Sequence, residues 1–430
     1  MLASISPVVT LLVSAALFMI GHGIQITLIP LRSELEGFSD FMIGAGASFY
    51  SVGFIVGCLV APYAILRAGH IRAFAAMISF ASAVALMHVI IIDPIAWVIF
   101  RTISGFCVAG FYITLESWLN DRATNETRGF VLSIYIVTVS LSIIVGQLAV
   151  AFGTVGSFML FAVSSILVSV AVIPVTMTSS AQPAPITLVR LRPARLYHTS
   201  PAAFVSILIV GLVIGAVMNL APLYATRSGY TEQFAAFFAA AIFAGGALMQ
   251  WPLGRASDLV DRRFVLLICA LAAMTASTGM IFAGSLGVIA LLVFGAMVGG
   301  FTQPAYAIAN AHAFDYVEPE DYVETSSGIL MIYGVGAAIS PMIVAAMMQQ
   351  IGPAALFWFA AAMNVVMAVF LLARMTARSA VPEEDKEDFD YASTAPLVAM
   401  GVEEAWDQED QVLVPEGYEP SDDDLVDEKA

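Results

Sequence analysis

The chain has 430 residues, of which 60% are hydrophobic and 12% are charged, about half the charged share of an ordinary soluble domain. No soluble fold of this length has an interior large enough for so much apolar surface, so the composition excludes a soluble globular protein and requires surrounding lipid. The formal net charge of −16 comes entirely from residues 382–430, where 18 Asp and Glu outnumber two lysines. Residues 1–381 are neutral overall, and we expect no nucleic-acid partner.

Twelve apolar runs are each long enough to cross a bilayer, which takes about 20 residues per helix. They lie at roughly 7–31, 41–65, 71–92, 94–119, 129–152, 156–177, 201–225, 233–253, 264–283, 286–311, 327–348 and 354–373. An even number of spans places both chain ends on one side of the membrane. Twelve arginines of the connecting segments fall on that side and only Arg32 and Arg227 on the other, which predicts cytoplasmic termini in the cell (inner) membrane.

The first and fourth runs carry ionisable side chains at membrane depth, which indicates a substrate or proton pathway. His22 and Gln25 lie near the middle of the first run, and an imidazole can titrate near neutral pH. Arg101 in the fourth run keeps its charge, so it should attract an anion or pair with a carboxylate. The alternatives are helix packing for His22 and snorkelling to the outer interface for Arg101.

Other polar and aromatic side chains in the runs are candidates to face a cargo site, with helix packing as the alternative for each. They are Tyr135, Asn219, Gln250, Gln303, Tyr306, Asn310 and Tyr333. No Asp or Glu lies in the central part of any run. This absence argues against an exporter of cationic drugs but leaves proton coupling through His22 open.

The segments at the ends of the second and fourth runs carry charges that we expect at the cytoplasmic surface. PYAILRAGHIR (62–72) contains Arg67 and Arg72. Glu116 stands near the end of the fourth run and should pair there with Arg128 or a neighbouring loop arginine. An ordinary interfacial carboxylate is the alternative.

The twelve runs form two sets of six, and the fourth runs of the two sets resemble each other. GFCVAGFYITLESWLNDRA (105–123) aligns with GAMVGGFTQPAYAIANAHA (295–313), which pairs Gly105 with Gly295 and Asn120 with Asn310. Duplication predicts an all-α integral membrane protein of two pseudo-symmetric six-helix halves, with a cargo site between them near the midplane.

The domain boundaries follow from this division. Residues 1–177 form the first half, 178–200 a polar cytoplasmic linker, and 201–381 the second half. Residues 382–430 have the composition of a disordered acidic tail, which would lie on the cytoplasmic side.

A dense charged stretch, GRASDLVDRR (254–263), follows the eighth run. It resembles the signature loop of the major facilitator superfamily, Gly-x-x-x-Asp-(Arg/Lys)-x-Gly-(Arg/Lys)-(Arg/Lys). It departs from this pattern at Asp261, which stands in place of the second Gly, and at Leu259, which replaces the first basic residue. Gly254 would let two helices approach closely. Asp258 would accept bonds from arginines such as Arg262 and Arg263 when the cytoplasmic side closes, a latch of about 1–3 kcal/mol. A solvated basic loop is the alternative.

GHIRAF (69–74) and ESWLNDR (116–122) resemble a narrower branch, the YcaD-like transporters, and this resemblance extends over residues 1 to about 380. It implies a secondary transporter that moves a small solute by alternating access, and we expect proton-linked export of a small organic compound. The alternatives are a uniporter or importer of an anionic or neutral metabolite and, from another class, a non-transporting sensor that signals through the acidic tail.

The sequence contains no pattern of a nucleophile–base pair, a metal cluster or a phosphate-binding loop. We therefore expect no enzymatic activity, no metal and no cofactor. The expected partners are a small-molecule substrate, protons and the lipid bilayer. One such bundle encloses a complete pathway, so a monomer is expected.

Overall fold

The computed structural model describes residues 2–122, 127–177, 193–283, 286–317 and 322–377, and these consist of helices joined by short connections. The predicted tail and most of the predicted linker lie outside the described residues. The helices are α1 (Leu2–Leu35), α2 (Asp40–Ala68), α3 (His70–Ile90), α4 (Pro94–Arg122), α5 (Arg128–Ala151), α6 (Phe158–Val170), α7 (Val172–Thr176), α8 (Pro193–Thr199), α9 (Pro201–Arg227), α10 (Glu232–Leu259), α11 (Arg262–Ala283), α12 (Val288–Phe314), α13 (Tyr322–Ile351) and α14 (Ala355–Ala377).

Twelve segments of the described chain are long and apolar enough to cross a membrane, which confirms the twelve predicted spans. In lipid every backbone N–H and C=O must be satisfied within the segment, so apolar runs of this length fold as helices. The sixth span is divided into α6 and α7, which adjoin at Ala171.

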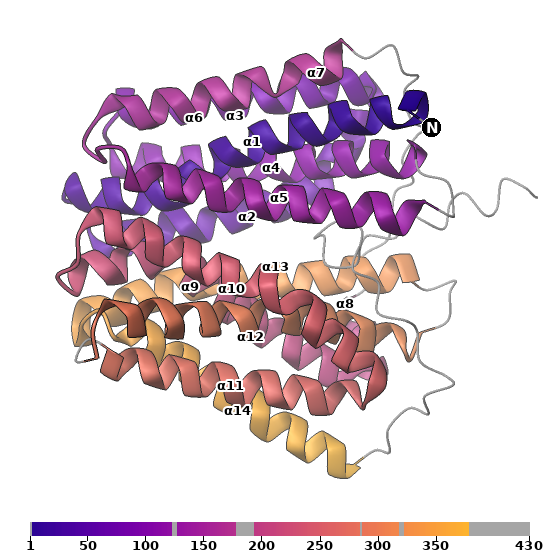
Figure 1. Ribbon diagram of the computed structural model, residues 1–430, viewed down its shortest axis with the longest axis vertical. Coiled ribbons are helices and arrows are strands. Elements are labelled where there is room, and N and C mark those ends of the chain that lie inside the picture. The colour runs from indigo at the N-terminus through magenta and orange to yellow at the C-terminus, as the bar shows by residue number, and fades with distance from the viewer. Residues whose placement is uncertain (1, 123–126, 178–192, 284–285, 318–321, 378–430) are drawn as a thin grey trace, which may run out of the picture.

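The helices lie side by side in two groups, α1 to α7 and α9 to α14 (Figure 1). The first residues of α1 and the last of α14 lie at the same side of the bundle, which we call the terminal face. The turn between α1 and α2 and the turn between α9 and α10 lie on the opposite side, the far face.

The charged motif after the eighth run is mostly helical, contrary to the prediction of a loop over 254–263. Helix α10 continues through Leu259, so Gly254 and Asp258 lie on its last turns and only Val260 and Asp261 connect it to α11. The equivalent link of the first half is a single residue, Gly69, whose φ of 82° suits glycine. The charged residues mark the end of the apolar segment, but the helix continues beyond that point.

Glycines set the closest helix contacts in both halves. An added Cβ on Gly105 of α4 would overlap the carbonyl oxygen of Tyr50 in α2, and one on Gly299 of α12 would overlap that of Ile242 in α10. The same backbone approach therefore recurs in the two halves, as duplication requires. It equates Gly105 with Gly299, whereas the sequence comparison chose Gly295. The predicted offset of 190 was therefore short by four residues, about one helical turn.

The two halves meet along α2 with α13, α5 with α10, and α1 with α9. Gly44 of α2 lies against Met342 of α13, where an added Cβ would approach the Met342 Cα to 3.0 Å. The Met342 N–H donates to the Ser48 hydroxyl across this interface (3.2 Å). The halves thus pack closely on the far-face side of the midplane.

Candidate functional site

A central cavity with a volume of about 260 Å³ lies between the two halves. Helices α4, α5, α9, α10, α12 and α13 supply its walls, so both halves contribute. The lining residues are Tyr112, Tyr135, Ile136, Val139, Ser140, Ile143, Ile214, Met218, Phe243, Ala247, Gln250, Gln303, Tyr306 and Tyr333. None of these fourteen side chains is an acid, a lysine, an arginine or a histidine.

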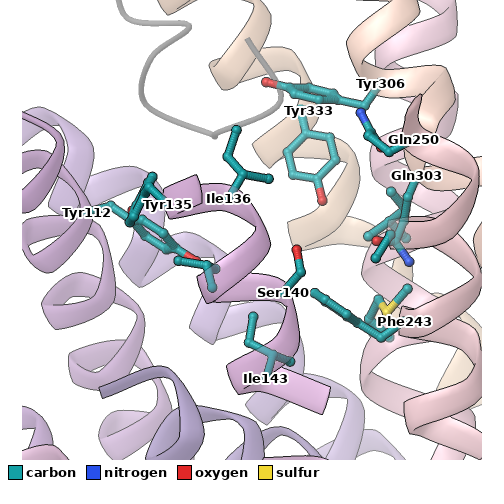
Figure 2. Close-up of a pocket in the computed structure, with 14 residues that line it drawn as sticks. Tyr112, Tyr135, Ile136, Ser140, Ile143, Phe243, Gln250, Gln303, Tyr306 and Tyr333 are labelled. Carbon is teal, nitrogen blue, oxygen red and sulfur yellow. The ribbon is translucent and has the colours of Figure 1, made fainter. Parts of the chain in front are cut away.

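The polar groups of the cavity face one another across the interface. Ser140 of α5 lies on one wall, and Gln303 and Tyr333 lie on the other (Figure 2). The Tyr306 and Tyr333 rings meet edge to face with centroids 4.9 Å apart. A mostly apolar lining with a few hydrogen-bonding groups is typical of small-molecule sites.

Gln303 is held in place by α10. Its amide Nε2 donates to the backbone carbonyl of Ile242 (3.3 Å), and an added Cβ on Gly246 would overlap the Gln303 amide. Because glycine stands at 246, the Gln303 side chain can lie flat against α10 beside the cavity. This contact fixes the position of one of the cavity's two amides.

Glu116 does not lie at the surface of the terminal face, so the prediction of a surface position for it was wrong. It is buried, with 3% of its surface exposed, and its Oε1 accepts a hydrogen bond from the hydroxyl of Tyr135, which lines the cavity (3.1 Å). Its Oε2 is buried and has no hydrogen-bond partner in the part of the chain that the structure describes. Glu116 is one full turn and more from the end of α4, so the helix carries it inside the bundle. The Arg128 side chain is outside the described part.

A second buried cluster joins His22, Tyr50 and Arg101 from three helices of the first half. The Tyr50 hydroxyl lies 3.2 Å from His22 Nε2, and the Arg101 guanidinium carbon lies 4.3 Å from the centroid of the Tyr50 ring. Both His22 and Arg101 are buried. Arg101 therefore does not snorkel to the interface, and it stacks on an aromatic face instead.

Three of the predicted polar residues lie away from the central cavity. Gln25 faces α6, where its amide donates to the hydroxyl of Ser164 (3.0 Å). Asn219 donates to the carbonyl of its own helix at Gly215 (2.9 Å), and Asn310 is fully buried in α12. Tyr135, Gln250, Gln303, Tyr306 and Tyr333 do line the cavity. Sequence position alone did not separate the two groups.

Ion pairs close the far face between the halves. Arg227 of α9 donates to both carboxylate oxygens of Asp40 at 2.5 and 2.8 Å and to Glu34 at 2.9 Å, and the Thr226 hydroxyl donates to Glu34 at 2.6 Å. We call these four residues the far-face cluster. Sequence reasoning treated Arg227 only as a charge in an outer loop and missed the cluster, because its partners Asp40 and Glu34 are 187 and 193 positions away in the chain.

The charged motif at the terminal face makes its described contacts within the second half. Arg262 is 1% exposed and pairs with Asp315 at 3.0 Å and with Asp258 at 3.5 Å. Arg263 pairs with Asp261 at 2.7 Å, and Asp261 also accepts from the Arg263 backbone N–H (2.9 Å). Gly254 is buried, whereas Arg67 and Arg72 of the first half are exposed.

Asp261 stands where the signature usually has glycine, and the structure gives it a local role. Partial burial acts to raise the pKa of its carboxyl, but the hydrogen bonds and charge of Arg263 outweigh burial and hold that pKa below its usual value. The carboxylate therefore stays ionised beside the first N–H groups of α11, where a negative charge is favourable.

A cavity between two related bundles of six helices, closed at one face by ion pairs, defines a membrane transporter and not an enzyme. The model of the Major Facilitator Superfamily matches residues 11–305 and 204–409, and the chain belongs to this superfamily. Over 375 residues it is 28% identical to the uncharacterized MFS-type transporter YcaD of Escherichia coli O45:K1 (strain S88 / ExPEC), covering 85% of this chain and 95% of the relative.

Two solved structures share the fold. The nucleoside transporter NupG superposes with a TM-score of 0.70 at 15% identity, covering 86% of this chain and 100% of that one. A bacterial homologue of the human lysosomal transporter Spinster, in an inward-facing and occupied conformation, gives a TM-score of 0.65 at 16% identity over 88% of this chain and 97% of that one. At these identities the likeness shows the fold alone.

Proposed function

We propose that the protein is a monomeric secondary transporter that carries a small organic compound across the inner membrane by proton-linked export. Cargo binds in the central cavity, and the halves rock around it to open one face at a time. The single observation that carries the proton linkage is the buried Glu116 beside the cavity: one carboxyl oxygen accepts a hydrogen bond from Tyr135, and the other has no partner among the described residues.

The conformation corresponds to an inward-facing state. The far-face cluster joins the halves, and the cavity residues lie from the midplane toward the terminal face: Tyr135 is seven residues from the start of α5, and Gln250 is nine residues from the end of α10. The arginine bias toward the terminal face supports its assignment to the cytoplasm. Cargo would therefore enter the cavity from inside the cell.

The lining favours a compound with a planar apolar body. Tyrosine and phenylalanine rings supply apolar faces, and Gln250, Gln303 and Ser140 supply hydrogen-bond donors and acceptors. The cavity itself offers no charge to neutralise a charged cargo body.

Glu116 replaces His22 as our candidate for the proton site. Glu116 has no cationic partner among the described side chains, so its carboxyl group within the bundle can be neutralised by one proton, and Tyr135 connects it directly to the cavity wall. His22 shares Tyr50 with Arg101, and a proton on His22 would place two cations around one ring. The cargo in the central cavity and the proton on Glu116 would then bind at neighbouring positions, one after the other.

The test begins with a thermal-stability screen of the purified protein against metabolites and drugs, followed by flux of the best compound in proteoliposomes with an internal pH dye. Cargo addition should move protons in the wild type. Glu116→Gln should abolish cargo-driven proton movement while cargo exchange continues. Glu232→Gln, at the exposed start of α10, is the control and should behave as the wild type. Undiminished proton movement in Glu116→Gln would refute the assignment.

The second candidate is a uniporter or importer of a neutral metabolite. The uncharged lining favours it, and NupG, whose fold is similar, is a nucleoside transporter. The same flux assay separates the two candidates, because a uniporter moves cargo without proton movement and follows the cargo gradient alone.

A further inference from the structure

Arg101 is a buried cation that has no carboxylate partner among the described residues. Only 4% of its surface is exposed, and its Nη1 is buried with no hydrogen-bond partner in the described part of the chain. Its described contact is the face of the Tyr50 ring. Burying an unpaired charge is unfavourable, so its retention inside a membrane protein points to a function.

The other buried arginines of the described chain differ in this respect. Arg32 bonds to Glu36 at 2.6 Å, Arg262 to Asp315 at 3.0 Å, and Arg263 to Asp261 at 2.7 Å. Each of them has a negative partner supplied by the protein. For Arg101 the negative partner must come from elsewhere.

A small pocket adjoins Arg101 on the far-face side of the midplane. It has a volume of only about 20 Å³, room for one small polar group, and is lined by residues that include Ser33, Gly46, Trp97, Arg101 and Asn219. Arg101 belongs to the first half and Asn219 to the second, so the pocket spans the interface that must open during transport. The glycine at 46 leaves the Arg101 Cγ within 3.7 Å of where a Cβ would stand, so the arginine lies closely along α2.

The pocket offers the donors that an oxyanion needs. A guanidinium presents a planar fork of N–H groups that matches a carboxylate. The Asn219 amide uses one N–H for the Gly215 carbonyl and has a second to donate. No acidic residue lines this pocket to compete for Arg101.

We propose that Arg101 and Asn219 bind an oxyanionic group, such as a carboxylate, that the cargo carries as it passes between the central cavity and the far face. This rests on the proposed function only in that cargo crosses between the halves. The uncharged cavity then holds the body of the compound, and the Arg101 pocket selects its negative end. An anion held by one group from each half also draws the halves together on this side.

The experiment compares matched acid and amide probes by thermal stability of the purified protein at about pH 7.5, where carboxyls are ionised. The pairs are benzoate with benzamide and indole-3-acetate with indole-3-acetamide, and formate serves as a free anion. The variants are Arg101→Gln, Arg101→Lys and Asn219→Ala. Arg255→Gln, which removes an exposed arginine at the end of α10, is the control.

In the wild type and in Arg255→Gln, the acid should bind with an apparent Kd on the order of tenfold below that of its amide. Arg101→Gln should fold and bind acid and amide equally, and Asn219→Ala should reduce the preference. Equal binding of acid and amide by the wild type, or an acid preference that survives in Arg101→Gln, would overturn the proposal.

Two further outcomes are decisive. If Arg101→Gln fails to fold, the test passes to Arg101→Lys, which keeps the positive charge but not the planar fork of N–H groups. It should retain a weaker preference for the acid over the amide. A folded Arg101→Lys with no such preference in any pair would overturn the site. Stabilisation by formate equal to that by benzoate would overturn the assignment to the cargo in favour of a free anion. The result for Glu116→Gln leaves the acid–amide comparison unchanged, so the two proposals fail separately.

Discussion

The far-face cluster should keep the far face closed, and replacing Arg227 should allow that face to open. Arg227→Gln removes a bidentate bond to Asp40 and a bond to Glu34 and leaves two neighbouring carboxylates without a cation. The side chains of Arg227, Glu34 and Asp40 are 22%, 28% and 12% exposed, so solvent screens them only in part. Removing one partner costs under about 1 kcal/mol for a surface ion pair and about 3–5 kcal/mol for a buried one. For this partly buried cluster of three charges we expect the closed far face to lose about 3 kcal/mol of stability relative to the open one.

Such a loss changes the ratio of closed to open far face about 150-fold. A protein with a ratio near 99:1 would then be about 40% closed. Nitroxides at Leu35→Cys and Gln233→Cys, both exposed on the far face, would report this as a second, longer distance in double electron–electron resonance. The native Cys58, Cys107 and Cys269 are buried, which favours selective labelling.

Arg32 provides a matched control for this measurement. It lies near the same face and bonds to Glu36 at 2.6 Å and to the Val155 carbonyl at 3.1 Å, both within the first half. Arg32→Gln therefore removes a comparable arginine without breaking a bond between the halves. An unchanged distance distribution in Arg227→Gln, or equal opening in Arg32→Gln, would refute the reasoning.

Three other predictions concern single contacts. Asp315→Asn should lower the free energy of unfolding by about 3 kcal/mol, because it removes the shorter ion pair of the buried Arg262, and denaturant titration checks this. Asp258→Asn should cost under about 1 kcal/mol of stability yet slow transport severalfold in proteoliposomes at equal protein content, and wild-type turnover would contradict the latch. Gly245→Ala should destabilise by about 2 kcal/mol because its Cβ meets the Ala296 carbonyl, whereas Gly246→Ala should mainly displace the Gln303 amide and weaken cargo binding at near-normal melting temperature.

The spans and their division into two halves follow from the sequence because lipid leaves so few choices. A run of about 20 apolar residues can satisfy its backbone only as a helix, so length and hydropathy suffice. Helix ends are a different matter, as α10 shows by continuing six residues past the run that ended at 253. Hydropathy predicts where the membrane boundary lies, not where a helix ends. The backbone hydrogen bonds of α10 continue through the charged motif as far as the C-cap residue Val260.

The site was only partly predictable because facing direction is a tertiary property. Gln25 and Gln303 are both amides in apolar runs, yet one bonds within its own half and the other lines the cavity. Glu116 was misplaced because its distance from the loop was taken as small, although α4 continues to Arg122 and buries it. The pairing of Arg227 with Asp40 depends on how the halves meet, which no local pattern records.

The two charged clusters have different architectures, and this difference bears on the alternating access that we propose. The far-face cluster crosses between the halves, so opening that face breaks its bonds. Two states of a working transporter must differ by only a few kcal/mol, so new bonds of similar strength have to form at the terminal face. Asp258 is the group suited to this: its pair with Arg262 is longer than that of Asp315, and its side chain is 15% exposed against 1% for Asp315. Asp315 can hold Arg262 in place while Asp258 changes partner, so the same arginine remains buried and paired in both states.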